Sequence, residues 1–266
     1  MRSADKMTED CQAAFWNERS DDFAKDINKK KGRKRTADIL GFLEEAGFRT
    51  QGAHILDIGC GPGTLSLPLA RAGANVTSVD IASGMLDRLK ETADREGLPV
   101  KTTECSWWTA DIEKLGFRNK FDLVIACMTP AIRDEETLNR MMACSRNYCY
   151  YIHLIQRGGG TAHQDILPEI FEMRPRPQSM GLLFPFMYLY INDYRPLIRF
   201  RHERWKETVE WTEVADRAID FLKHIHSCDE ATEKKIRKYY KKSAQEMKFR
   251  PQPEAYSGMM LWTVSH

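Results

Sequence analysis

Short apolar segments alternate with helix-like segments along the middle of the chain, and this rhythm limits the fold more than any other feature. Between residues 53 and 155 the strand-like segments read AHILDIG, ANVTSVD, PVKTTEC, KFDLVIACM and NYCYYIHLI. Two more, IRFRHERW and SGMMLWTV, follow in the last third of the chain and bring the number to seven. The pattern predicts an α/β fold with a doubly wound, mostly parallel seven-stranded sheet and helices on both faces.

The segments on either side of this core predict additions to one domain rather than separate domains. Residues 1–50 carry apolar side chains at helical spacing around the basic stretch KKKGRKR, which reads as a solvated turn, so we expect an N-terminal helical cover. The α/β core is expected over 51–155, and the rest of the sheet with a helical insertion that serves as a lid over 156–266. Ser83 and Thr212 are the expected N-caps of the helices SGMLDRLKETADREG and TEVADRAIDFLKHI.

Composition and charge argue against several classes of protein. The 266 residues include 40 basic and 38 acidic ones, and the net charge of +2 gives no global reason to expect a polyanionic partner. Seven cysteines without a C-x-x-C pair predict neither a disulfide framework nor a metal site. The sequence shows no secretory leader and no 18-residue apolar run, so we expect a cytoplasmic protein that does not bind membranes.

The stretch ILDIGCGPGTLSLPL, from Ile55 to Leu69, places three glycines at every second position between a strand and a helix. Glycine permits positive φ angles and lets a ligand touch the backbone, while free N–H groups at the start of the next helix attract polar or negative atoms. The loop is therefore expected to hold a nucleotide cofactor. Its G-x-G-x-G spacing at Gly59, Gly61 and Gly63 departs from the G-x-G-x-x-G of dinucleotide-binding proteins, so a pyrophosphate is not expected.

The motif DIGCGPG at residues 57–63 resembles the first motif of the class I S-adenosylmethionine-dependent methyltransferases, an acidic residue and one spacer followed by G-x-G-x-G. Three later segments match that family in order, and the resemblance covers residues 53 to 132. It implies a Rossmann-like, cofactor-binding core over 51–155. The implied cofactor is S-adenosyl-L-methionine, with S-adenosyl-L-homocysteine as the product.

The resemblance also implies roles for individual residues. Asp80 stands where the family's carboxylate grips the ribose, and a carboxylate can accept from both hydroxyls. Asp111 stands where the family contacts the adenine, although it can also act as an N-cap of the segment IEKL. Cys60 and Cys127 also read as small buried residues. The expected cofactor-binding residues are Asp57, Gly59, Cys60, Gly61, Gly63, Asp80, Ile81, Asp111, Ile112 and Cys127.

The segment after the fourth strand, CMTPA at 127–131, bears on the methyl acceptor. It matches neither the Pro-Cys setting of RNA cytosine-5 methyltransferases nor the Asp/Asn-Pro-Pro-aromatic tetrad of enzymes that methylate amino groups in nucleic acids. We therefore expect a small-molecule acceptor. The alternatives are an RNA or protein methyltransferase and a non-catalytic S-adenosylmethionine-binding module.

Two basic segments keep nucleic acid among the alternatives, although it is disfavoured. They cover residues 29–35 and 234–242, and the second contains Tyr239 and Tyr240, which could stack on bases. The competing interpretation is that both are solvated surface.

Methyl transfer requires mainly that the protein hold the acceptor in line with the methyl group and exclude water. A general base is needed only where the acceptor is protonated at neutral pH. His153, at the expected end of the fifth strand, is the first candidate, and a structural histidine is the alternative there. The other candidates are Tyr188, Tyr190, His163 and Asp193.

The aromatic segment 181–195 follows the fifth strand, and insertions there lie above the carboxyl edge of such sheets. It is predicted to be a lid over an aromatic acceptor pocket. A core helix or a dimer contact is the alternative, so the sequence leaves the oligomeric state open, a homodimer included. The acceptor and the atom that is methylated also stay open.

Overall fold

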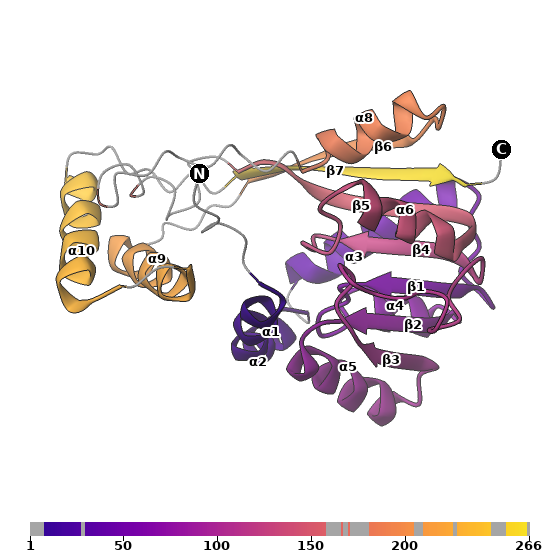
Figure 1. The fold of residues 1–266 in the computed structure, drawn as a ribbon, viewed down its shortest axis with the longest axis horizontal. Helices are drawn as coiled ribbons and strands as arrows, with labels where there is room; N and C mark the ends of the chain where they lie inside the picture. Colours follow the sequence, from indigo (N-terminus) through magenta and orange to yellow (C-terminus); the bar gives the residue numbers. More distant parts are fainter. Residues whose placement is uncertain are drawn as a thin grey trace. The chain divides into compact units, whose positions relative to one another are not determined.

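A computed structural model describes residues 8–27, 30–157, 166, 170, 181–204, 210–225, 228–245 and 254–264 of the chain. Its helices are α1 (Glu9–Glu18), α2 (Ser20–Ile27), α3 (Lys30–Glu45), α4 (Ser66–Arg71), α5 (Ser83–Glu96), α6 (Glu135–Cys144), α8 (Leu183–Ile191), α9 (Trp211–Ile225) and α10 (Glu230–Gln245). Its strands are β1 (His54–Ile58), β2 (Asn75–Asp80), β3 (Val100–Glu104), β4 (Phe121–Cys127), β5 (Ser145–Arg157), β6 (Leu197–Arg204) and β7 (Glu254–Thr263) (Figure 1).

These seven strands form one sheet in the order β3-β2-β1-β4-β5-β7-β6 (Figure 1). β1 pairs in parallel with β2 and with β4, β2 with β3, and β4 with β5. The predicted seven-stranded, mostly parallel α/β fold is confirmed. The chain leaves β1 toward β2 on one side and later returns to β4 on the other, and such a reversal opens a crevice at the carboxyl ends of the strands.

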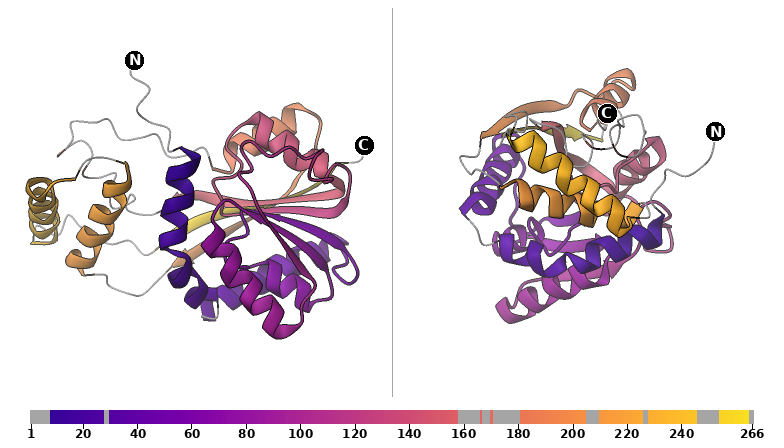
Figure 2. Two further views of the ribbon diagram at one scale, coloured as in Figure 1. Left: turned by 60° about the horizontal axis from the view of Figure 1, so that its bottom comes forward. Right: turned by 90° about the vertical axis from the view of Figure 1, so that its left-hand side faces the viewer.

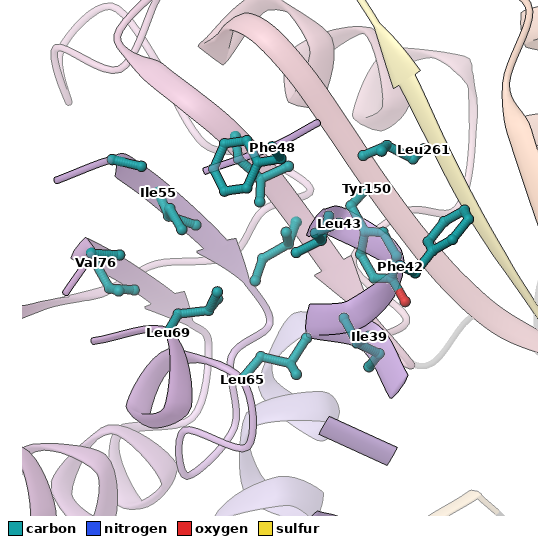
Figure 3. Close-up of a cluster of buried hydrophobic side chains, with 14 of the residues drawn as sticks. Ile39, Phe42, Leu43, Phe48, Ile55, Leu65, Leu69, Val76, Tyr150 and Leu261 are labelled. Carbon is teal, nitrogen blue, oxygen red and sulfur yellow. The ribbon is translucent and has the colours of Figure 1, made fainter. Parts of the chain in front are cut away.

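A buried cluster joins the sheet to α3 and α4 (Figure 3). Alternate strand residues such as Ile55 and Tyr150 face it, because successive side chains of a strand point to opposite faces. From α3 comes Phe42, whose ring lies edge-on to that of Tyr150 with 6.3 Å between centroids. Leu69 of α4 is also buried there. The cluster holds α4, and with it the glycine loop that precedes α4, against the sheet.

Three local expectations are corrected by the structure. α3 begins at Lys30, so the basic stretch read as a turn is helical from that residue onward. Lysine and arginine are good helix formers, and the buried face of the same helix stabilises its first turns. Ser83 is the first helical residue of α5 rather than its cap, and Ala82 in the cap position offers no side-chain hydrogen bond. Thr212 lies inside α9, which begins at Trp211.

The chain divides into two compact units. The first comprises residues 1–153, 184–199 and 259–266 and contains the glycine loop; within it α1 and α2 pack against α5 (Figure 2). The second comprises residues 154–183 and 200–258, and there α9 and α10 pack side by side around their own buried cluster (Figure 2). Among the described residues, no helix is both long and apolar enough to cross a bilayer.

Candidate functional site

The glycine loop lies between β1 and α4, beside the end of β2. The backbone N–H groups of Gly59 and Cys60 both donate to the carbonyl oxygen of Val79, over 2.7 and 3.1 Å. These two bonds fasten the loop to β2. The loop therefore lies at the carboxyl edge of the sheet where the strand order reverses, which is where such folds bind ligands.

At two of the three glycines of this loop, neighbouring protein side chains leave no room for a Cβ atom. Gly59 has a φ of +63°, and a Cβ atom there would lie 2.1 Å from Oγ1 of Thr129. Gly63 has a φ of +94°, and its Cβ would lie 2.4 Å from Cδ1 of Leu89. Both distances are far shorter than van der Waals contact. Gly59 and Gly63 are thus required for packing within the protein, and their contact with a cofactor stays a prediction.

Gly61 differs from its two neighbours in the loop. Its φ is +54°, but the nearest atom to a Cβ there would be Sδ of Met85 at 4.0 Å, an ordinary van der Waals distance, so no protein atom would clash with a side chain at this position. Its backbone N–H donates to Oδ2 of Asp80 over 2.8 Å. Gly61 is therefore the glycine whose missing side chain leaves room for a ligand.

Asp80 links the glycine loop to the start of α5. Its side chain is buried, and Oδ1 accepts a hydrogen bond of 3.0 Å from the N–H of Ala82 while Oδ2 accepts from Gly61. Burial raises the pKa of this carboxyl, and the two backbone bonds oppose the rise. A carboxylate offers about four acceptor positions, so positions remain for ribose hydroxyls.

Asp57 lies beneath the loop, fully enclosed by protein. Its Oδ2 accepts a 2.6 Å hydrogen bond from the hydroxyl of Ser66, which in turn accepts one of 2.9 Å from the hydroxyl of Ser78. Burial, with a smaller contribution from the charge of Asp80, raises the pKa of Asp57 to about 7 against the lowering effect of the Ser66 hydrogen bond. Asp57 thus connects β1, α4 and β2 directly below the loop.

The two carboxylates give the site an unbalanced negative charge. Within the part of the chain that the structure describes, no basic side chain forms an ion pair with Asp57 or Asp80. A buried charge without a counter-charge is costly, and a cation nearby lowers that cost. The site is therefore electrostatically suited to a ligand that carries positive charge.

Comparison with known proteins agrees with this geometry. A family model described as a methyltransferase domain matches residues 55–148, the stretch that holds the loop and both carboxylates. Over this stretch the chain is similar to a methyltransferase domain. The chain is 31% identical over 107 residues to the ubiquinone biosynthesis O-methyltransferase of Actinobacillus pleuropneumoniae, covering 40% of this chain and 45% of that protein. It is 39% identical over 90 residues to the protein of the same name from Coxiella burnetii, covering 34% and 36%. The chain thus spans less than half the length of these relatives.

A solved structure supports the fold over a longer stretch. Magnesium protoporphyrin IX methyltransferase from Synechocystis PCC 6803, crystallised with bound S-adenosylhomocysteine, superposes with a TM-score of 0.59 and 14% identity. The match covers 96% of this chain and 98% of that one. At this level of identity the likeness shows a shared fold and nothing about the acceptor.

Asp111 caps the short turn that follows it. Its Oδ1 accepts from the backbone N–H groups of Glu113 and Lys114, over 3.2 and 3.1 Å, and its Oδ2 lies 3.3 Å from Nζ of Lys114. Hydrogen bonding to Lys114 lowers the pKa of this carboxyl. Ile112 beside it is buried. The capping alternative is therefore observed, and contact of Asp111 and Ile112 with adenine stays a prediction.

The two cysteines of the expected site lie in different surroundings. The buried thiol of Cys60 donates to the carbonyl oxygen of Gly61 over 3.4 Å, and burial raises its pKa well above the usual value. Cys127 ends β4 and packs against the cluster around α3. Both fit the alternative of small apolar residues. Ile81, half-buried between Asp80 and Ala82, is placed beside the loop by the bond from Gly61 to Asp80.

His153 lies within β5, which continues to Arg157, so the expectation that it ends the strand is wrong. Its ring stacks on that of Tyr151, with centroids 6.0 Å apart and 12° between the planes. Its neighbour Ile152 pairs with Cys127 and accepts a 2.9 Å hydrogen bond from the N–H of Met128. His153 is therefore level with the turn that follows β4, on the face opposite the α3 cluster.

The aromatic helix α8 is placed against α6. The phenol of Tyr188 donates to Oδ1 of Asn139 over 3.0 Å, whereas Tyr190 is 55% exposed and lies beside the guanidinium of Arg195. Asp193 has a φ of +64° where the helix ends. None of the hydrogen bonds described for these side chains reaches the glycine loop, and their roles as base or lid stay predictions. His163 lies outside the described residues.

Sequence reasoning missed the residues that hold the loop from a distance. Thr129 is buried where a side chain at Gly59 would be, and Met128 before it has a φ of +53°, a conformation that is rare without glycine. Ser66 binds Asp57 from the next helix. A strained, non-glycine turn after β4 has no marker in the sequence, because only the fold brings it to the loop.

Proposed function

We propose that the chain is an S-adenosyl-L-methionine-dependent methyltransferase that acts on a small molecule. The observation that carries this proposal is the open face of Gly61 beside two buried carboxylates, Asp57 and Asp80. S-Adenosyl-L-methionine carries a sulfonium and an ammonium group, so it matches both the space and the charge. The described residues fit this cofactor, and none of the ion pairs among them brings a basic side chain to Asp57 or Asp80, where the pyrophosphate of a dinucleotide would need one.

The cofactor supplies, when bound, a methyl group made electrophilic by the positive sulfur. The residues of the chain do the rest of the work by binding and orientation. The hydrogen bond from the Gly61 amide to Asp80 fixes the backbone against which the cofactor lies. The acceptor positions of Asp80 that remain receive the ribose hydroxyls. Asp57 keeps this arrangement rigid through Ser66.

The acceptor belongs on the side of the turn after β4. His153 is level with that turn, and it is our first candidate for removing a proton if the acceptor carries one. A small-molecule acceptor is supported by the names of the relatives, which refer to ubiquinone biosynthesis. Which compound this chain methylates, its cytoplasmic location and its oligomeric state stay predictions of the sequence.

The proposal is tested by binding and by turnover. Titration calorimetry should show binding of S-adenosyl-L-methionine and S-adenosyl-L-homocysteine but not of NAD. Label from the cofactor methyl group should then appear in products of a metabolite pool rather than in total RNA or protein. Tight NAD binding would refute the cofactor, labelled RNA or protein would refute the acceptor class, and cofactor binding without any labelled product would favour a non-catalytic module.

A further inference from the structure

The N-terminal helices touch both chain segments that flank the proposed adenosine site. We propose that Glu9 and Asn17 of α1 are positioning residues that hold these two segments in shape for the cofactor. The proposal rests on the function proposed above. Neither residue belongs to a motif, and both act on parts of the chain that are far away in sequence.

Glu9 holds the turn that follows β3. Its carboxylate accepts hydrogen bonds from the hydroxyls of Ser106 and Thr109, the second over 3.0 Å. The oxygen of Ser106 also accepts the backbone N–H of Trp108 over 3.2 Å, so the carboxylate binds a turn that is already organised. This turn leads directly into Asp111, where the adenine is expected. Hydrogen bonds to an ionised group are among the stronger ones in proteins, so Glu9 is well suited to fix it.

The same turn is held on its other side by α6. The guanidinium of Arg140 donates to the carbonyl oxygens of Trp107 and Trp108, over 2.6 and 3.1 Å. The indole N–H of Trp107 donates to the carbonyl oxygen of Thr137 over 3.1 Å. The turn is thus clamped between α6 and α1, and loss of Glu9 would release one side while the other stays bound.

Asn17 supplies the cap that α5 lacks. Its Oδ1 accepts a 2.8 Å hydrogen bond from the backbone N–H of Gly84 in the first turn of α5, where Ala82 gives no side-chain cap. A Cβ at Gly84 would lie 3.1 Å from this Oδ1 and 3.2 Å from Oγ of Ser20, so α1 and α2 fit closely onto this turn. The segment from Asp80 to Gly84 would carry the ribose contact, and Asn17 fixes its far end.

Three variants test the role of Glu9. Glu9→Ala removes both hydrogen bonds, Glu9→Gln keeps an oxygen acceptor without the charge, and Asp10→Ala removes the neighbouring exposed carboxylate as a matched control. We expect Glu9→Ala to raise the KM for S-adenosyl-L-methionine by about tenfold, equivalent to about 1.4 kcal/mol. The kcat at saturating cofactor should be unchanged, Glu9→Gln should recover much of the loss, and Asp10→Ala should behave as the wild type. Equal KM values for Glu9→Ala and Asp10→Ala would overturn the proposal.

Amide hydrogen exchange of the ligand-free chain separates this proposal from the proposed function. In Glu9→Ala the amides of residues 106–112 should exchange faster than in the wild type, and in Asn17→Ala those of residues 82–86 should do so. Unchanged exchange in both variants would overturn the positioning role. If the wild-type chain binds no S-adenosyl compound, the proposed function fails and the effect on cofactor with it, while the exchange rates still decide whether these side chains hold the two segments.

Discussion

Substitution of Gly61 by alanine should separate cofactor binding from folding. The nearest protein atom to the added methyl group would be Sδ of Met85 at 4.0 Å, so no clash with protein is expected. The φ of +54° does carry a cost for alanine, about 1–2 kcal/mol for a residue in the left-handed region. We therefore expect Gly61→Ala to fold with a modestly lower free energy of unfolding and to lose binding of S-adenosyl-L-methionine, because the methyl group occupies the volume of the ligand.

The chain offers a matched control in Gly97. Its φ is +64° and nothing lies within 4 Å of its Cβ position, so Gly97→Ala carries the same backbone cost without approaching the loop. Gly59→Ala gives the opposite contrast, since its Cβ would lie 2.1 Å from Oγ1 of Thr129 and the loop would have to move. Gly59→Ala should therefore destabilise the fold more than either of the other two.

Urea denaturation and titration calorimetry on the same preparations make the comparison. Gly61→Ala and Gly97→Ala should have similar midpoints of unfolding, and only Gly97→Ala should bind cofactor as the wild type does. Wild-type affinity in a folded Gly61→Ala variant would refute the reasoning, because the cofactor would then not approach this residue.

The remaining predictions concern Asp80, Asp57 and the core. Asp80→Ala should weaken cofactor binding at least tenfold in calorimetry, because it removes ribose contacts worth roughly 1.5–3 kcal/mol each and frees the Gly61 amide; unchanged affinity would place the ribose elsewhere. Since the pKa of Asp57 is raised to about 7, the ligand-free native state retains a proton that the unfolded state has lost, and urea denaturation should show stability falling as pH rises from about 4 to 7. Asp57→Asn should flatten that fall, and an identical pH profile would contradict the raised pKa. Phe42→Ala should lower the free energy of unfolding by about 3–5 kcal/mol, and a loss below about 1 kcal/mol would show that the ring against Tyr150 is not part of a tight core.

The order of strands and helices could be predicted from the sequence because its signals are local. Strand β4 reads FDLVIAC, a short apolar run, and α6 follows an aspartate that caps it, so each element carries its own pattern. The start of α3 could not be predicted in this way. KKKGRKR has no apolar face, and its helical state depends on Ile39 and Phe42 further along the same helix, which are buried against the sheet.

The residues of the candidate site also fall into those that have a local sequence signal and those that do not. Gly61 and Asp80 could be found from the motif and from the end of the second strand, and the structure joins them by a hydrogen bond. The partners that shape them could not be found. Thr129 beside Gly59 and Asn17 at the start of α5 act across long sequence distances, and neither residue type is unusual where it stands. Ser83 looked like the cap of α5 because a local rule was applied where a distant side chain fills the role.

The charge of the site gives these separate observations a common physical basis. The charge of Asp80 disfavours ionisation of the buried Asp57, so the ligand-free domain at neutral pH either retains a proton on Asp57 or bears the cost of a second buried charge. A sulfonium or ammonium group next to the loop would favour the ionised form of both, and binding would then release the proton. The carboxylates that destabilise the ligand-free domain would in this way favour a positively charged cofactor over the neutral thioether of its product, because only the cofactor brings charge at the sulfur atom.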